Sequence, residues 1–315
     1  MDNKKSLINF RGSNIESNYD ELYQAKIYRY EKLSDIPWLT FQNDIDIPVR
    51  IIVWPKEEIL PVDLLFIPRN SRQLLIGFHG AEARNQANLP KFQFVRSFTN
   101  ERTESLLFFS DSTLLLNEKI ALGWMTGNSQ SHFLPRVVST INSASNALDY
   151  THTTLVGHSA GGFSAIAVGS YISNSVAVSI NGQVVVGAHE IWTVKALQEA
   201  IYPEEYIYTS MLSRYCERMD LRFFLKNRVS NSSFNLYAHK DDPNMMTTCP
   251  HFPILTKFFG IGLEGGVTSN NDSMVLCDWE RKNNVSPHAL PGTVIPFIQL
   301  SLGEKTKLDV RVVTT

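Results

Sequence analysis

The segment Gly157-His158-Ser159-Ala160-Gly161 constrains the fold of this chain more than any other part of the sequence. It follows residues 153–156, which are rich in β-branched side chains, and it precedes the small and apolar residues 162–168. This order predicts a strand, a tight turn and a helix. The glycines two residues before and two residues after Ser159 allow the strand and the helix to approach closely. The pattern is typical of a nucleophile elbow, and it makes Ser159 the candidate nucleophile.

Composition places the chain among ordinary globular proteins. Of its 315 residues, 43% are hydrophobic and 19% are charged, and the formal net charge is −2. The sequence has no basic stripe, so we expect no nucleic-acid partner. It also has no apolar signal segment near its start and no apolar run of the roughly 20 residues that cross a bilayer. We therefore expect a cytoplasmic protein without a membrane span. The three cysteines lack the spacing of a zinc site or a disulfide framework, which fits reduced thiols.

Apolar runs separated by helical stretches predict an α/β fold with a mainly parallel central sheet and helices on both faces. Residues 133–150 repeat apolar side chains at helical spacing, and they lead directly into the strand before Ser159. Residues 1–48 are polar and are expected to form an irregular or partly helical N-terminal segment, which leaves 49–315 as the main domain. The predicted strands are 49–53, 62–67, 74–78, 105–109, 153–156, 176–180, 234–238 and 274–277.

A long segment of about residues 190–230 lies between two predicted strands and is rich in Tyr, Leu, Met, Arg and Phe. It forms either a helical cap over the site or ordinary helices that cover the sheet. In the first case its aromatic side chains would exclude water and set the specificity for the acyl or leaving group.

A serine nucleophile needs a base and a group that orients the base. The strand 234–238 ends in His239-Lys240-Asp241-Asp242, and an orienting carboxylate belongs at the end of such a late strand. Asp242, immediately before a proline, is the first candidate, and Asp241 is the second. His288 follows the last predicted strand, where a loop would place its imidazole over Ser159. His251 is the competing candidate for the base, but it precedes that strand, so it is expected to line the pocket.

The tetrahedral intermediate of acyl transfer needs two donors for its oxyanion. One is expected to be the backbone N–H of Ala160, the residue after the nucleophile. The second should come from the loop after the strand 74–78, where His79-Gly80-Ala81 stands. A glycine there lets the backbone turn inward, so the N–H of Gly80 or of Ala81 is the candidate donor.

Taken together, the elbow, the loop at Gly80, the acid and His288 resemble the α/β-hydrolases over about residue 49 to the C-terminus. A weaker resemblance links the chain to hydrolase-fold proteins of bacterial surface-polysaccharide and accessory-secretion systems. It depends on Phe109-Ser110-Asp111-Ser112-Thr113-Leu114, Leu122-Gly123-Trp124, Gly127-Asn128, the Ser-Ala-Gly-Gly-Phe elbow and His288-Ala289-Leu290-Pro291. The chain departs from the pattern in having Pro287 where a glycine commonly precedes the histidine.

The sequence thus predicts a serine hydrolase or acyltransferase that acts on a carboxyl ester or related acyl group, with Ser159, His288 and Asp242 as its triad. The substrate would be a small-molecule or glycan acyl compound, and the chemistry requires no metal or diffusible cofactor. A glycan O-acyltransferase and a non-catalytic component of a surface-polysaccharide or secretion assembly are the alternatives. The sequence does not indicate an oligomeric state.

Overall fold

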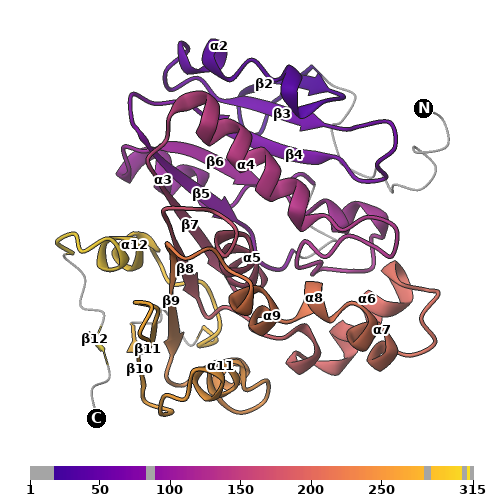
Figure 1. Cartoon of the computed structure of the whole chain (residues 1–315), viewed down its shortest axis with the longest axis vertical. Coiled ribbons are helices and arrows are strands. Elements are labelled where there is room, and N and C mark those ends of the chain that lie inside the picture. Colours follow the sequence, from indigo (N-terminus) through magenta and orange to yellow (C-terminus); the bar gives the residue numbers. More distant parts are fainter. Residues whose placement is uncertain (1–17, 83–88, 280–284, 307–310, 313–315) are drawn as a thin grey trace.

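The computed structural model describes residues 18–82, 89–279, 285–306 and 311–312, and it is built around one large sheet (Figure 1). The strands follow the order β1-β2-β3-β4-β6-β5-β7-β8-β9-β11-β10, and β12 pairs with β11. They are β1 (Tyr19–Asp20), β2 (Ala25–Tyr30), β3 (Val49–Val53), β4 (Val62–Ile67), β5 (Gln73–Phe78), β6 (Ser105–Phe109), β7 (His152–His158), β8 (Ser175–Ile180), β9 (Ser232–His239), β10 (Gly265–Val267), β11 (Ser273–Asp278) and β12 (Arg311–Val312).

The predicted mainly parallel sheet is confirmed. Every pairing from β6 across β5, β7, β8 and β9 to β11 is parallel, whereas β4 runs antiparallel to both β3 and β6. The strands β3, β4, β5, β6, β7 and β8 are buried along almost their whole length. That burial is why they read as continuous apolar runs in the sequence.

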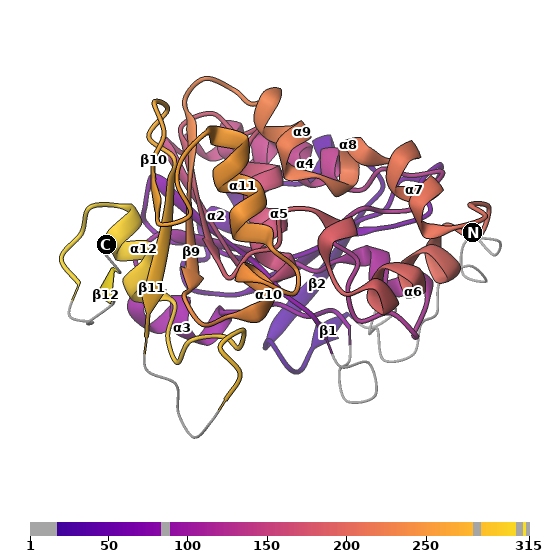
Figure 2. The ribbon, with the colours of Figure 1, turned by 90° about the horizontal axis from the view of Figure 1, so that it is seen from below.

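Helices cover both faces of the sheet (Figure 2). Helices α3 and α12 bury apolar side chains against one face, and α4, α5, α9 and α11 bury theirs against the other. Adjacent residues of β7 show the division. Leu155 packs on the face that α4, α5, α9 and α11 cover, and Val156 packs on the face that α3 and α12 cover. The helices are α2 (Trp38–Gln42), α3 (Val95–Glu101), α4 (Leu134–Leu148), α5 (Ala160–Gly169), α6 (Ile191–Ile201), α7 (Tyr208–Arg214), α8 (Cys216–Met219), α9 (Leu221–Lys226), α10 (Pro243–Met246), α11 (His251–Phe259) and α12 (Ile295–Ser301).

The described part of the N-terminal segment, residues 18–48, contains the short helix α2, as a partly helical segment would, but it also forms the strands β1 and β2, which the sequence did not predict. Strand β2 lies before residue 48 and pairs with β3, which lies after it, so the sheet extends across the predicted boundary. The fully buried guanidinium of Arg50 also connects the two parts. Its Nε and Nη2 donate to the carboxylate of Asp63 at 2.9 and 2.6 Å, and its Nη1 donates to Asp20 at 3.0 Å. A buried charge with this many partners stabilises one specific arrangement of β1, β3 and β4, because losing a partner would leave it uncompensated.

Helices α6 to α9 occupy the segment between β8 and β9 that the sequence marks at about 190–230. In Figure 1 they form a group beside the end of the sheet at which β7 enters α5. None of the helices in the described part of the chain combines the length and the apolar character that a membrane crossing requires. The segments that follow β5, β7, β8, β9 and β11 meet at the carboxyl end of the parallel strands, which is where α/β sheets bind their ligands.

Candidate active site

Ser159 occupies a strained turn between β7 and α5. Its backbone angles are φ 55° and ψ −120°, a region that non-glycine residues rarely adopt. A Cβ atom on Gly157 would lie 2.0 Å from the carbonyl oxygen of Gly161, and one on Gly161 would lie 2.5 Å from the carbonyl oxygen of Phe78. Glycine is therefore required at both positions. The predicted strand, turn and helix are all present.

At this turn, the side chains of Ser159, His288 and Asp242 are connected by hydrogen bonds. Nε2 of His288 lies 2.9 Å from Oγ of Ser159, and Nδ1 of His288 lies 2.7 Å from Oδ2 of Asp242. Asp242 is fully buried, and its other oxygen, Oδ1, accepts the N–H of Asn244 at 2.9 Å. Asp241 is exposed and lies 3.6 Å from the ammonium group of Lys240. Of the two candidate acids, the structure places Asp242 on the histidine.

Two hydrogen bonds hold the loop that carries His288. The side-chain amide of Asn181, just after β8, donates to the carbonyl oxygen of Pro287 at 2.9 Å. Nε2 of His158, inside the elbow, donates to the carbonyl oxygen of His288 at 2.7 Å. The backbone is thus anchored at both peptide groups that flank His288. This is how the chain presents His288 with a proline in the position where a glycine commonly stands.

The loop after β5 passes directly beside Ser159. A Cβ atom on Gly80 would lie 3.0 Å from the carbonyl oxygen of His158. The N–H of Gly80 already donates to Oε1 of Gln93 at 3.0 Å. Nε2 of His79 accepts the N–H of Asp111 at 2.9 Å, so the proton of a neutral His79 is on Nδ1, which donates to the carbonyl oxygen of Gly80 at 2.8 Å.

This arrangement separates the two candidate oxyanion donors. The carbonyl of Gly80 and the N–H of Ala81 belong to the same trans peptide, so they point in opposite directions. Because Nδ1 of His79 binds the Gly80 carbonyl oxygen, the N–H of Ala81 points away from His79. Ala81 lines the same cavity as Ser159. Ala160 is the first residue of α5, so its N–H has no acceptor within the helix. The N–H groups of Ala81 and Ala160 are therefore the two that suit an anion beside Ser159.

Asp111 connects two of the sequence segments on which the weaker resemblance depends, residues 109–114 and 122–124. Its backbone N–H fixes His79, and its Oδ2 accepts the N–H of Met125 at 2.9 Å. A Cβ atom on Gly123 would lie 2.6 Å from that same Oδ2, so only glycine fits there. Asp111 thereby supports the loop at Gly80 on one side and the indole of Trp124 on the other.

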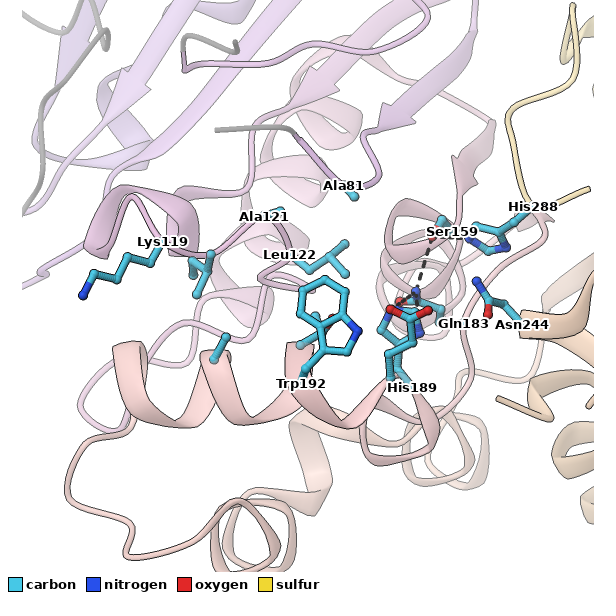
Figure 3. A pocket seen from close by; sticks show the side chains of 14 residues that line it. Ala81, Lys119, Ala121, Leu122, Ser159, Gln183, His189, Trp192, Asn244 and His288 are labelled. Carbon is cyan, nitrogen blue, oxygen red and sulfur yellow. Dashed lines mark hydrogen bonds between the residues drawn. The ribbon is translucent and has the colours of Figure 1, made fainter. Parts of the chain in front are cut away.

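Gln183 is a site residue that sequence reasoning missed. Its Nε2 donates to Oγ of Ser159 at 3.3 Å and lies 3.3 Å from Nδ1 of His189 (Figure 3). Its Oε1 accepts a hydrogen bond from the indole N–H of Trp124. Nothing in the sequence marks this glutamine except its position three residues after the strand that follows the elbow.

His251 was expected to line the pocket, and this prediction is wrong. Its ring is fully buried behind His189, with ring centroids 6.1 Å apart, and its Nδ1 accepts the N–H of Val184 at 3.3 Å. His189 itself reaches the cavity. Burial lowers the pKa of His189 to about 4 and that of His251 to about 3, so both rings are neutral at pH 7.

The cavity in front of Ser159 has a volume of about 250 Å³. One wall is apolar and comes from Ile120, Ala121 and Leu122, and α6 closes the opposite side with Trp192 (Figure 3). The indole of Trp192 is 67% exposed, so it forms a rim and is not part of the core. Among the described residues, no group of three or more His, Cys, Asp and Glu side chains is placed to hold a metal ion.

One buried and two half-buried histidines predict a loss of stability in mild acid. Burial lowers the pKa of His132 and His158, like that of His189, to about 4. An unfolded histidine titrates near pH 6.5, so between these values the unfolded chain binds more protons than the folded chain. Stability is therefore complete above about pH 6.5 and falls as the pH drops toward 4, by at most about 1.4 kcal/mol per pH unit for each histidine.

Urea unfolding at pH 7.5, 6.5 and 5.5 measures this effect. We expect the free energy of unfolding to fall by several kcal/mol over this range. A His132→Gln variant, which removes one of these histidines without changing the lining of the cavity, should show a shallower slope. A free energy that stays constant from pH 7.5 to 5.5 would contradict the assignment of these rings as buried and neutral.

No protein-family model and no curated protein sequence matches the chain. Similar solved structures include an acylaminoacyl peptidase in complex with Z-Gly-Gly-Phe-chloromethyl ketone, with a TM-score of 0.50 and 12% identity over 77% of this chain. The Gap123 glycosylation-associated complex from Streptococcus agalactiae has a TM-score of 0.49 and 14% identity over 64% of this chain. The capsule O-acetyltransferase of Neisseria meningitidis serogroup A has a TM-score of 0.48 and 18% identity over 64%.

The chain spans 39% of the peptidase chain, 38% of the Gap123 chain and 81% of the acetyltransferase chain. These likenesses concern the fold alone. The resemblance that the motifs predict is confirmed at this level: the chain has the α/β-hydrolase fold.

Proposed function

We propose that the protein is a serine acyl hydrolase or acyltransferase that works through a covalent acyl-enzyme. The observation that carries the proposal is the chain of hydrogen bonds from Ser159 through His288 to Asp242, with distances of 2.9 and 2.7 Å, on an elbow turn. A buried carboxylate on Nδ1 keeps the proton there, so Nε2 is free to accept the proton of the serine hydroxyl.

In the first half of the reaction, Oγ of Ser159 attacks the acyl carbonyl carbon while Nε2 of His288 takes the hydroxyl proton. The new Oγ–C bond pushes the carbonyl electron pair onto oxygen, which the N–H groups of Ala160 and Ala81 stabilise. The intermediate then collapses, the bond to the leaving group breaks, and His288 returns its proton to the leaving oxygen. The acyl group stays on Ser159.

The second half removes the acyl group. Water or another hydroxyl compound gives its proton to His288 and attacks the acyl carbon, and Oγ leaves and recovers the proton. Hydrolysis and transfer share the acyl-enzyme and differ only in the acceptor. The cavity favours an uncharged acyl group, because the wall beside Ser159 consists of Ile120, Ala121 and Leu122. Trp192, on the first helix of the segment for which the sequence allows either a cap or sheet-covering helices, would limit the size of that group.

Labelling of the purified protein with a fluorophosphonate probe tests the proposal. We expect one adduct, which peptide mass mapping places on Ser159, because the probe requires an activated serine hydroxyl. The adduct should be absent from a Ser159→Ala variant and strongly reduced in a His288→Ala variant. Folded wild-type protein that takes up no label would contradict the proposal and favour a non-catalytic role for the fold.

A further inference from the structure

The orientation of the Gln183 side chain follows from its neighbours. The indole N–H of Trp124 can only donate, so the amide atom that faces it must be the oxygen. The amide nitrogen therefore faces Oγ of Ser159 at 3.3 Å and the ring of His189. His189 is a ring that burial keeps neutral, so it can accept the second N–H of the amide. Each polar atom of the amide thus has a partner that agrees with one orientation.

Gln183 also has a fixed backbone. Its backbone N–H donates to the carbonyl oxygen of Ser159 at 3.1 Å. A main-chain hydrogen bond therefore connects Gln183 and Ser159 in addition to the contact between their side chains. The side chain is 1% exposed, as is that of Trp124. Behind them, Oδ2 of Asp111 accepts the N–H of Met125, next to the indole. The amide is consequently held in place before any substrate arrives.

We propose that Gln183 is a catalytic residue that directs the attacking lone pair of Ser159 and stabilises Oγ when it leaves. Oγ has four tetrahedral directions. One is the bond to Cβ, one is the hydrogen shared with His288, and one is the lone pair that accepts from Gln183. The second lone pair, which attacks the carbonyl carbon, lies along the fourth direction. Because the other three directions are fixed, the direction of attack is fixed as well. Trp124 acts as the positioning residue that sets the amide.

The same hydrogen bond acts in the second half of the reaction. When the acyl group leaves, the C–Oγ bond breaks and its electron pair moves to Oγ, which then takes the proton from His288. An N–H that points at Oγ stabilises the charge that develops there before the proton arrives. A hydrogen bond to a developing charge is stronger than one between neutral groups. Loss of the amide should therefore slow both the formation and the breakdown of the acyl-enzyme.

This inference rests on the proposed function, and its test uses variants that preserve the shape of the side chain. Gln183→Leu removes both donors, and Gln183→Glu keeps an acceptor for Trp124 but has no proton for Oγ when it is ionised. Trp124→Phe keeps a ring and removes the indole donor. Gln198→Leu is the matched control, because Gln198 is also buried and donates to the carbonyl oxygen of Glu205 without lining the cavity.

The readouts are the second-order rate of fluorophosphonate labelling and the turnover of p-nitrophenyl acetate, with thermal unfolding to verify folding. We expect Gln183→Leu to label about tenfold more slowly and Trp124→Phe about threefold more slowly, the range expected for one hydrogen bond. Gln198→Leu should stay within about twofold of the wild-type rate, since it changes no contact to the nucleophile.

The pH profile of Gln183→Glu separates a donor from a side chain that only fills space. Its labelling rate, divided by the wild-type rate at the same pH, should rise as the pH is lowered from 9 to 6. The reason is that position 183 is buried, and burial raises the pKa of a carboxyl group above its usual value of about 4.3. As the pH falls, the protonated glutamate regains an O–H that can donate to Oγ. A ratio that does not change with pH, or a Gln183→Leu variant that labels within twofold of wild type, would overturn the inference while the proposed function stands.

A different result would affect the proposed function itself. If the folded wild-type protein takes up no label, both the proposed function and the role of Gln183 fail. The two failures are therefore distinguishable, because the first is judged on the wild-type protein alone. If Gln183→Leu does not fold, Gln183→Glu provides the decisive measurement, since it still accepts the hydrogen bond from Trp124.

Discussion

Replacing Ser159 with alanine is expected to reduce the turnover of an acyl ester by about 10⁴- to 10⁶-fold, the range seen when a nucleophilic serine is removed. The loss would be so large because Oγ is the atom on which the acyl-enzyme forms, and alanine has no nucleophile at that position. Residual activity would come from Ala160, Ala81 and the cavity, which still bind and polarise the ester. Turnover of p-nitrophenyl acetate under saturating conditions measures the effect.

The fold should survive this change. The backbone hydrogen bonds of the elbow, such as the one from the N–H of Ser159 to the carbonyl oxygen of Ile180 at 3.1 Å, do not involve Oγ. Ser164→Ala is the matched control, because Ser164 is a buried serine of α5 whose hydroxyl donates to the carbonyl oxygen of Ala160 at 3.1 Å. It should retain nearly full turnover. If Ser159→Ala retains a tenth or more of wild-type turnover, Ser159 is not the nucleophile.

Most of the sheet could be predicted because its strands are buried on both faces and read as apolar runs. The strand β2 was missed for the opposite physical reason. In its sequence, Ala-Lys-Ile-Tyr-Arg-Tyr, only Ala25 and Ile27 are buried, and Lys26 and Arg29 make it resemble a solvated segment. Only its pairing with β3 and the buried contact of Arg50 with Asp20 show that this region belongs to the sheet. Both are long-range contacts that local patterns do not encode.

The same distinction applies to the site. The positions of Ser159, Asp242 and His288 could be predicted because each stands in a segment that follows a strand, in a fixed chain order. Gln183 could not, since its role depends on Trp124, which is 59 residues away in the sequence. The choice between Gly80 and Ala81 likewise depends on the contact between His79 and Asp111, 32 residues apart. Sequence order thus identifies candidate groups, and tertiary contacts decide how they are oriented.

Replacing Asp242 with asparagine is expected to reduce turnover by about 10³- to 10⁴-fold, as for other triads that lose this charge. The local hydrogen bonds explain why an isosteric amide would fail. Oδ1 of Asp242 accepts the N–H of Asn244, so in the variant the amide oxygen must occupy that position. The NH₂ group is then left facing Nδ1 of His288, where Oδ2 stood at 2.7 Å. Two donors cannot share this contact.

The imidazole must therefore move its proton to Nε2, which then points a donor at Oγ of Ser159 and can no longer accept the hydroxyl proton. Asp241→Asn is the matched control, because that side chain is 51% exposed and contacts Lys240 rather than His288. Its turnover of p-nitrophenyl acetate should remain within about twofold of wild type, as expected for a surface substitution. The reverse result, with Asp241→Asn inactive and Asp242→Asn active, would show that Asp241 orients His288 during catalysis. Equal and small effects would instead mean that His288 needs no carboxylate to hold its tautomer.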